Sequence, residues 1–233
     1  MSTFPDQFRL DGRTALITGS RRGLGWEMAK GLAELRQAGH AADRVAFDMA
    51  DRAAMRQALA GHDHIDILIH NVGERDRRPF TEIEPDDFAR LVDVDLSAAH
   101  ALVKLVAPGM IARGWGRVIL VTSIAGQLAV PGASSYIAAK GGLTAFARAL
   151  AAELGPTGIT ANALSPGFFA TETNLQIMAS PMGERQRERC PAKRWAAPHE
   201  IAGAALFLAS PAASFVNGHT LVVDGGVSAT YLA

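Results

Sequence analysis

Short apolar runs alternate along this chain with longer amphipathic runs. The short runs are rich in β-branched residues and favour strands, whereas the longer runs are rich in Ala and Leu and favour helices. Strands are predicted at 14–18, 45–47, 65–69, 117–122, 159–164 and 219–223, and helices at about 24–34, 88–111 (divided near Pro108 and Gly109), 135–154 and 199–209. This alternation predicts a single α/β domain, 1–233, with a Rossmann-like, doubly wound parallel sheet in a three-layer α/β/α arrangement.

One interval is too short for that arrangement. Gly19 and Asp48 are 29 residues apart, which leaves room for one strand–helix–strand unit of about 30 residues. A doubly wound nucleotide-binding half needs a further strand and helix there, and 35–40 reads as the end of a different helix. A strand–helix unit is therefore absent near 34–35. We favour a segment omitted from this sequence, because a natural deletion would leave a hole in the sheet; an intact mass equal to 24.6 kDa would exclude omission.

Composition and charge narrow the classes of partner. Hydrophobic residues make up 48% of the chain and charged residues 20%, which is typical of globular proteins. The 23 basic and 23 acidic residues cancel, so no large electrostatic attraction to nucleic acid or an anionic membrane is expected. No segment approaches the roughly 20 apolar residues of a membrane helix. The single cysteine, Cys190, fits a reducing compartment. We expect a soluble, cytoplasmic protein.

A glycine-rich turn, Thr18-Gly-Ser-Arg-Arg-Gly-Leu-Gly25, follows the first predicted strand and precedes a helix. Its glycines allow a tight turn and close backbone approach, and the free N–H groups of a helix N-terminus bind a pyrophosphate. An ordinary turn is the alternative, but the position between strand and helix favours a nucleotide site. Arg21 and Arg22 are either solvated or paired with a 2′-phosphate, whose geometry a guanidinium matches.

Tyr136 and Lys140 are four residues apart on a predicted helix, so they share a face. A free phenol has a pKa of about 10, but a nearby ammonium stabilises the phenolate and lowers that pKa. Ser123 follows a predicted strand, at the end where parallel α/β sheets place ligands. An isolated Tyr/Lys pair is usually a surface pair, whereas its combination with the glycine turn favours an acid/base site.

Together these motifs resemble the short-chain dehydrogenase/reductase family. The resemblance covers nearly the whole chain and rests on Thr18-Gly-x3-Gly23-x-Gly25, Asn71-Val-Gly73, Ser123 and Tyr136-x3-Lys140, with further matches at Asp48, Ser165-Pro-Gly167, Thr171, Asn217-Gly218 and Asp224-Gly-Gly226. It implies hydride transfer between NAD(P)(H) and a ketone or secondary alcohol. Tyr136 would transfer the hydroxyl proton, Ser123 would orient the substrate oxygen, and Lys140 would lower the tyrosine pKa and hold the nicotinamide ribose. A homo-oligomer, either tetramer or dimer, is also implied.

The resemblance assigns further residues by position. The cofactor-binding set is Gly19, Ser20, Arg21, Arg22, Gly23, Leu24, Gly25, Asp48, Met49, Asn71, Val72, Gly73, Tyr136, Lys140, Pro166, Gly167, Phe169 and Thr171. Within it, Asp48 would contact adenine and Thr171 the carboxamide end. Arg22, directly before the second motif glycine, favours NADP(H) over NAD(H). The substrate set is Ser123, Gln127, Tyr136, Phe168 and Arg78.

One residue departs from the family pattern. The family commonly has an asparagine in the helix before the catalytic strand, where it supports a proton relay to the lysine, and this chain has Asp95. Aspartate has a similar shape but lacks the amide donor. Asp95 is therefore either a modified member of the catalytic group or an ordinary helical aspartate.

A finer resemblance is to gluconate 5-dehydrogenase-like members, carried by Arg77-Arg-Pro-Phe80, 191–195 and 215–219. Arg75, Arg77 and Arg78 either bind the carboxylate of a keto-acid or face solvent. The Arg- and Glu-rich segment at about 172–195 is expected to be a lid over the substrate.

The remaining candidates carry no chemistry in this interpretation. His62, His64 and His70 flank an apolar strand without further ligands at metal-site spacing, so we expect rim residues and no metal. Cys190 reads as an ordinary thiol. Two other functions stay open: a non-catalytic nucleotide-binding sensor or scaffold and, with less support, a dehydratase or epimerase.

Overall fold

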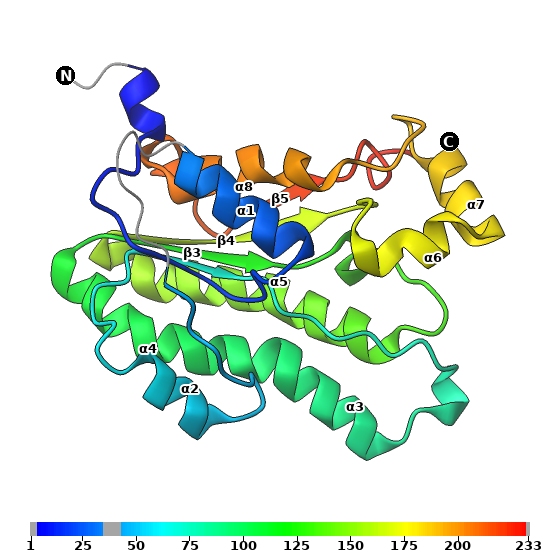
Figure 1. Cartoon of the computed structure of the whole chain (residues 1–233), viewed down its shortest axis with the longest axis horizontal. Coiled ribbons are helices and arrows are strands. Elements are labelled where there is room, and N and C mark those ends of the chain that lie inside the picture. Colours follow the sequence, from blue (N-terminus) through cyan, green and yellow to red (C-terminus); the bar gives the residue numbers. More distant parts are fainter. Residues whose placement is uncertain (1–3, 35–42, 232–233) are drawn as a thin grey trace.

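Five parallel strands form one sheet in the computed structural model, which describes residues 4–34 and 43–231 (Figure 1). From one edge to the other the order is β1 (Ala15–Ile17), β2 (Ile67–His70), β3 (Gly116–Val121), β4 (Ile159–Pro166) and β5 (Thr220–Val223). Each neighbouring pair is parallel. Every residue of β2, β3 and β4 is buried, as expected for central strands that are covered on both faces.

Helices cover both faces of the sheet. One face carries α1 (Gly23–Glu34) and α8 (Ala202–Ala209), and the other carries α2 (Arg52–Leu59), α3 (Pro85–Val92), α4 (Ala98–Arg113) and α5 (Ser134–Leu154) (Figure 1). Two short helices, α6 (Leu175–Met178) and α7 (Pro181–Arg189), lie beyond the carboxyl ends of the strands. The 3₁₀ turns are Pro5–Phe8, Phe80–Glu82, Ile124–Gly126, Gly155–Thr157, Glu172–Asn174, Pro198–Ile201 and Pro211–Ala213. The Rossmann-like three-layer prediction is therefore confirmed.

Two apolar cores hold the layers together, one on each face. Because successive side chains of a strand point to opposite faces, Val118 of β3 joins the core under α4 and α5, and Ile119 joins the core under α1 and α8. Leu143 of α5 and Met28 of α1 are both 0% exposed at the centres of these cores. The alternation therefore lets one strand contribute to both cores.

The predicted strand at 45–47 is wrong. Residues 43–48 have no regular secondary structure, although Val45 and Phe47 pack half-buried against the core. A strand needs a hydrogen-bonded neighbour, and β1 pairs only with β2 within the described part of the chain. The additional strand that a doubly wound half requires would have supplied that neighbour. The segment 35–40, read as the end of another helix, lies outside the described residues.

The helical run after β2 is interrupted at a different place from the predicted one. A π-helical segment, Asp93–Ser97, separates α3 from α4, and α4 continues through Pro108. Proline removes one helical N–H bond, but Pro108 and Lys104, whose carbonyl is released, are both exposed, so water can bind that carbonyl. The run Pro85–Arg113 is apolar and long enough to cross a membrane by length and composition alone, yet half of its apolar window is buried inside the protein. Its composition matches its place in the core.

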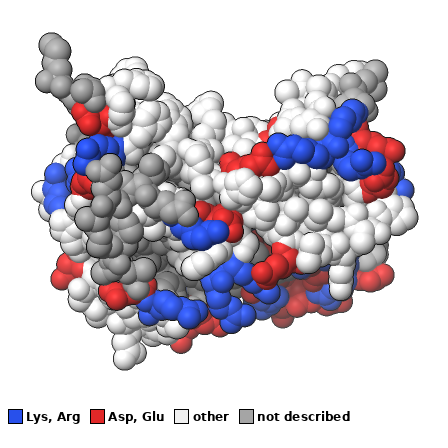
Figure 2. Space-filling view, turned by 45° about the horizontal axis from the view of Figure 1, so that its top comes forward, with Lys and Arg blue, Asp and Glu red and all other residues white. Residues whose placement is uncertain are grey.

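Charged side chains of both signs are intermixed on the face drawn in Figure 2, and no large field of one sign appears there. This distribution agrees with the formal net charge of zero. A surface of this kind gives little long-range attraction to a polyanion.

Candidate active site

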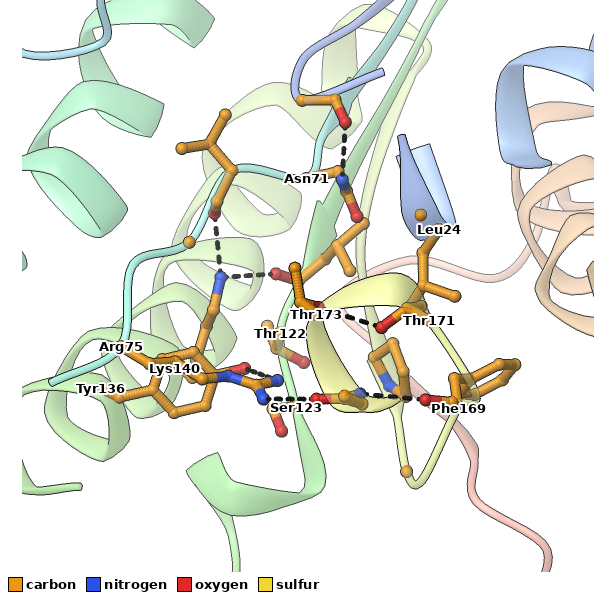
Figure 3. Close-up of a pocket in the computed structure, with 18 of the residues that line it drawn as sticks. Leu24, Asn71, Arg75, Thr122, Ser123, Tyr136, Lys140, Phe169, Thr171 and Thr173 are labelled. Atoms are coloured by element: carbon orange, nitrogen blue, oxygen red, sulfur yellow. Dashed lines mark hydrogen bonds between the residues drawn. The ribbon is translucent and has the colours of Figure 1, made fainter. Parts of the chain in front are cut away.

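A cavity of about 470 Å³ opens at the carboxyl ends of the strands, where parallel α/β sheets bind ligands (Figure 3). Its walls come from the turn after β1, the segment after β2, the end of β3, the first turns of α5 and the segment after β4. Residues that are far apart in the sequence therefore meet because four strands end, and α5 begins, at the same edge of the sheet. The glycine turn forms one wall, and Ser123, Tyr136 and Lys140 form the opposite part of the lining.

The glycine turn is shaped for close approach of a ligand backbone. Gly19 and Gly23 have φ angles of +64° and +60°, which side chains other than glycine rarely adopt. A Cβ atom on Gly25 would lie 2.4 Å from the Gly19 carbonyl oxygen and 2.7 Å from Asn71 Nδ2. Only glycine therefore fits where α1 begins. The exposed N–H groups of that helix end fit the pyrophosphate of a dinucleotide.

Lys140 is fixed between two strand ends. Its Nζ atom donates hydrogen bonds to the carbonyl oxygens of Val72, at 3.0 Å, and Val121, at 3.1 Å. The side chain is 3% exposed, and Nζ lies 5.6 Å from the ring centre of Tyr136. This geometry fixes the position of the lysine amine relative to the phenol.

The surroundings of Tyr136 adjust its acidity. Burial raises the pKa of the phenol, but the positive charges of Lys140 and Arg75 lower it, and so do hydrogen bonds with Ser123 and Arg75. The net result is a pKa below the usual value of 10.0. Ser123 also caps the following 3₁₀ turn, since its Oγ accepts the N–H of Ala125 at 3.1 Å. The group is suited to hold a carbonyl oxygen and to exchange a proton with it.

A second cation, Arg75, contacts the phenol. Its Nη2 lies 3.3 Å from Tyr136 Oη, and its guanidinium carbon lies 4.8 Å from the ring centre. Nη1 donates to Asn174 Oδ1 at 3.3 Å, so the arginine also joins the segment after β4. Arg77 lines the same cavity. Two guanidinium groups therefore face the space beside the tyrosine.

The predicted substrate residue Arg78 is bound to two nearby carboxylates. Arg78 does not line the cavity, and its guanidinium binds the carboxylates of Asp76 and Asp87 instead. The hydrogen bonds from Arg78 hold the pKa of Asp76 at about 2. Arg78 thus shapes the loop, whereas Arg75 and Arg77 face the cavity.

Most of the predicted positions meet at the cavity. Its lining contains Gly19, Arg22, Gly23, Leu24, Asn71, Val72, Gly73, Ser123, Tyr136, Lys140, Pro166, Gly167, Phe169 and Thr171. Thr173 and Asn174 also line it and were missed, although they lie within three residues of Thr171. Proximity to a motif was the available signal for both residues.

Other predicted positions lie away from this lining: Ser20, Arg21, Gly25, Asp48, Met49, Asp95, Gln127 and Phe168. Gly25 shapes the turn from behind. Asp48 is exposed and accepts the N–H of Ala50 at 2.9 Å, while Met49 is buried in the core. Gln127 is exposed, and Phe168 packs on Trp195 at 5.4 Å beside a second cavity of about 190 Å³.

His70 is not the rim residue that the sequence predicted. It is 0% exposed, and burial lowers its pKa to about 3, so the ring is neutral. Nδ1 lies 3.3 Å from Thr18 Oγ1, and Nε2 lies 3.3 Å from the main-chain oxygen of Asp95. The histidine therefore joins the strand ends to the π-helical segment.

Asp95 is buried next to this lysine–tyrosine group. Its side chain is 1% exposed, and Oδ1 accepts the N–H of Glu74 at 2.7 Å. Oδ2 lies 4.0 Å from Lys140 Nζ. Burial raises the pKa of this carboxyl, and the Lys140 charge opposes the rise.

Comparison with known proteins identifies the family. A family model described as enoyl-(acyl carrier protein) reductase matches residues 24–228. The gluconate 5-dehydrogenase of Gluconobacter oxydans (strain 621H) is 36% identical over 250 aligned positions, covering 96% of this chain and 98% of the relative. The chain belongs to the short-chain dehydrogenase/reductase family. As a member it is an NAD(P)-dependent oxidoreductase that acts on hydroxyl or keto groups, and the non-catalytic alternative is not favoured.

Two further members of this family are similar over nearly the whole chain. The 5-keto-D-gluconate 5-reductase of Escherichia coli (strain K12) is 32% identical, covering 95% of this chain and 98% of the relative. The crystal structure of a gluconate 5-dehydrogenase from Burkholderia cenocepacia J2315, in complex with NADP and tartrate, is 40% identical with a TM-score of 0.92. It covers 97% of this chain and 98% of that chain.

The aligned length in the first of these comparisons exceeds the length of this chain. The alignment with the Gluconobacter oxydans dehydrogenase spans 250 positions, more than the 233 residues of this chain. That relative therefore has residues with no counterpart here.

Proposed function

We propose that this enzyme transfers a hydride between NADP(H) and a keto or hydroxyl carbon of a small sugar acid, with Tyr136 as the general acid/base. The observation that carries the proposal is the position of the Tyr136 hydroxyl. The Tyr136 side chain lines a cavity whose opposite wall is a glycine turn suited to bind a dinucleotide. The Lys140 amine lies beside the tyrosine ring, and Arg75 and Arg77 line the same cavity.

The residues of the chain have separate roles in carbonyl reduction. When bound, NADPH supplies the hydride. Ser123 and Tyr136 donate hydrogen bonds to the carbonyl oxygen and polarise it, and Tyr136 gives up its proton as negative charge grows on that oxygen. Lys140 stabilises the phenolate that results, and hydrogen bonds to two strand-end carbonyls fix its position. In alcohol oxidation the same tyrosine receives the proton.

A carboxylate-bearing substrate is supported by the arginines. Arg75 and Arg77 line the cavity, and a guanidinium binds a carboxylate with two parallel hydrogen bonds. Two of the relatives are named for substrates that carry a carboxylate, gluconate and 5-ketogluconate. Tartrate in the Burkholderia cenocepacia structure is likewise a hydroxy acid. We therefore propose a keto-sugar acid or a related hydroxy acid.

NADP(H) is the proposed cofactor in preference to NAD(H). Arg22 lines the cavity beside the start of α1 and is exposed, so its guanidinium is accessible to a 2′-phosphate. The Burkholderia cenocepacia structure holds NADP. We propose that Gly19, Gly23 and Gly25 shape the pyrophosphate site, while Pro166, Gly167 and Thr171 bind the nicotinamide end.

Three further properties belong to this proposal. We infer that 172–195, which contains α6 and α7 beyond the carboxyl ends of the strands, acts as a lid over the substrate. Asn174 of this segment already binds Arg75. We also infer a homo-oligomer, either tetramer or dimer, that works in the cytoplasm and binds neither nucleic acid nor membrane.

The proposal is tested by rate assays with NADPH and NADH against a panel of ketones. The panel contains 5-ketogluconate and an uncharged keto-sugar such as fructose. Substrate-dependent oxidation of NADPH, faster than that of NADH and faster with the keto-acid, is the expected result. Equal rates with the acid and the uncharged sugar would contradict the arginine role. Tight NADPH binding with no turnover of any ketone would contradict the proposed reaction.

A further inference from the structure

An unpaired carboxyl oxygen is buried beside the amine of the catalytic lysine. Asp95 Oδ2 has no hydrogen-bond partner among the described residues and lies 4.0 Å from Lys140 Nζ. The two side chains are 1% and 3% exposed. A carboxyl group in such a place is costly unless a positive charge compensates it. Lys140 supplies that charge.

The hydrogen bonds of Lys140 leave one donor for this carboxyl. An ammonium has three N–H groups, and Val72 and Val121 accept two of them. Oδ2 of Asp95 is within ion-pair distance of the same nitrogen. The lysine is therefore hydrogen-bonded to two neutral carbonyls and lies within ion-pair distance of one acidic side chain.

The main-chain carbonyl of Asp95 is already engaged. Thr18 Oγ1 accepts the N–H of Asn71, so its hydroxyl proton is free to reach His70 Nδ1. The neutral ring then carries its proton on Nε2, which donates to the Asp95 carbonyl oxygen. The free acceptor of Asp95 beside the lysine is thus the carboxyl oxygen.

Among the described residues, the other charged groups that act on Asp95 are Glu74 and Arg75. Glu74 donates its backbone N–H to Oδ1, and its own carboxylate pairs with Arg90. Arg75 lies on the Tyr136 side of the group, and His70 is neutral. Lys140 is therefore the cation whose charge Asp95 most directly offsets.

We propose that Asp95 is a positioning residue whose carboxylate offsets part of the Lys140 charge and so weakens the stabilisation of the Tyr136 phenolate. This inference rests on the proposed function of the same site. The phenol then keeps its proton to higher pH than it would beside a neutral side chain. Since the protonated phenol is the form that donates to a carbonyl oxygen, Asp95 favours reduction in the neutral and mildly alkaline range.

The tyrosine content of the chain allows a direct test without substrate or cofactor. There are two tyrosines, Tyr136 and Tyr231, and Tyr231 is 98% exposed. In a Tyr231→Phe background the ultraviolet absorbance change of phenolate formation reports Tyr136 alone. The full chain is titrated with Asp95 intact, with Asp95→Asn and with Asp93→Asn.

Asp95→Asn keeps an oxygen for the Glu74 N–H and removes the charge. We expect the Tyr136 midpoint to fall by roughly one pH unit, the size of shift that a charge a few ångströms away produces. Asp93→Asn removes a carboxylate that is 50% exposed and paired with Arg52 in the same π-helical segment, and we expect no change. An unchanged midpoint in Asp95→Asn would overturn the inference. If Asp95→Asn does not fold, Asp95→Ser replaces it with the same expectation and the same overturning result.

A second measurement separates this inference from the proposed function. The pH profile of kcat for ketone reduction should lose activity on its alkaline side at lower pH in Asp95→Asn, by the same shift as the titration. If both the original chain and Asp95→Asn reduce ketones and their pH profiles of kcat superimpose, the inference is overturned and the proposed function is unaffected. A shifted titration midpoint in a protein that reduces no ketone would support the charge coupling and contradict the proposed function.

Discussion

Arg75 Nη2 lies 3.3 Å from the hydroxyl oxygen of Tyr136, and the same guanidinium stacks at 4.8 Å from the tyrosine ring. The contact joins the loop after β2 to α5. It gives the phenol a second neighbouring cation besides Lys140, and both charges favour the phenolate. Arg75 is thus placed to bind a substrate carboxylate and to affect proton transfer by the Tyr136 hydroxyl.

Loss of either cavity arginine should weaken binding of a keto-acid. Arg75→Gln or Arg77→Gln removes a charge-assisted hydrogen bond of about 1.5–3 kcal/mol, which corresponds to roughly a tenfold to hundredfold rise in KM. Steady-state kinetics with 5-ketogluconate measure this change. Arg78→Gln is the matched control, because its guanidinium binds Asp76 and Asp87 outside the cavity, and its KM should change little. An equal rise in all three variants would contradict the assignment.

Tyr136→Phe should remove most turnover and leave cofactor binding largely intact. The change deletes only the hydroxyl that exchanges the proton, and general acid/base catalysis contributes about 10²- to 10⁴-fold. Initial rates of NADPH oxidation give the turnover, and quenching of tryptophan fluorescence gives the NADPH affinity. Tyr231→Phe, at an exposed site, serves as the control and should keep the original rate. Near-normal activity of Tyr136→Phe would show that another group transfers the proton.

Gly25→Ala should impair the nucleotide site. The new Cβ would lie 2.4 Å from the Gly19 carbonyl oxygen, so the turn must move, at a cost of about 1–3 kcal/mol. Calorimetric titration should show at least tenfold weaker NADPH binding, together with a lower Tm. Gly203→Ala in α8 has no atom within 4 Å of the new Cβ and should be neutral or slightly stabilising. Unchanged NADPH affinity in Gly25→Ala would mean that the turn does not hold the cofactor.

His70 should make the protein less stable in acid. Its pKa is about 3 in the folded protein against a usual value of 6.5. As the pH falls below 6.5, His70 binds a proton in the unfolded chain but stays neutral in the folded protein. The free energy of unfolding therefore decreases until the pH reaches about 3. The slope from this one group approaches about 1.4 kcal/mol per pH unit.

Urea unfolding at a series of pH values measures that slope. His70→Asn should flatten it whatever its effect on stability at neutral pH, because the titrating ring is gone. His62→Asn is the control, since His62 is exposed, and it should leave the slope unchanged. A slope in His70→Asn equal to that of the original chain would assign the acid sensitivity to other groups.

The sequence by itself determined the α/β layers and the main catalytic candidates. Alternating apolar residues, the glycine turn and the spacing of Ser123, Tyr136 and Lys140 are local signals that survive in any structure of this family. Most of the residues that line the cavity belong to these motifs. The strand expected at 45–47 failed because a strand depends on a neighbour that a local pattern does not contain.

Tertiary structure alone decided which charges meet. Sequence proximity could not distinguish Arg75 and Arg77, which face the cavity, from Arg78, which binds two carboxylates beside it. It also could not show that His70 is buried or that Asp95 Oδ2 lies 4.0 Å from Lys140 Nζ. Local patterns specify elements, but charge interactions depend on distance and burial, and these are set only when separate strands end at one edge of the sheet.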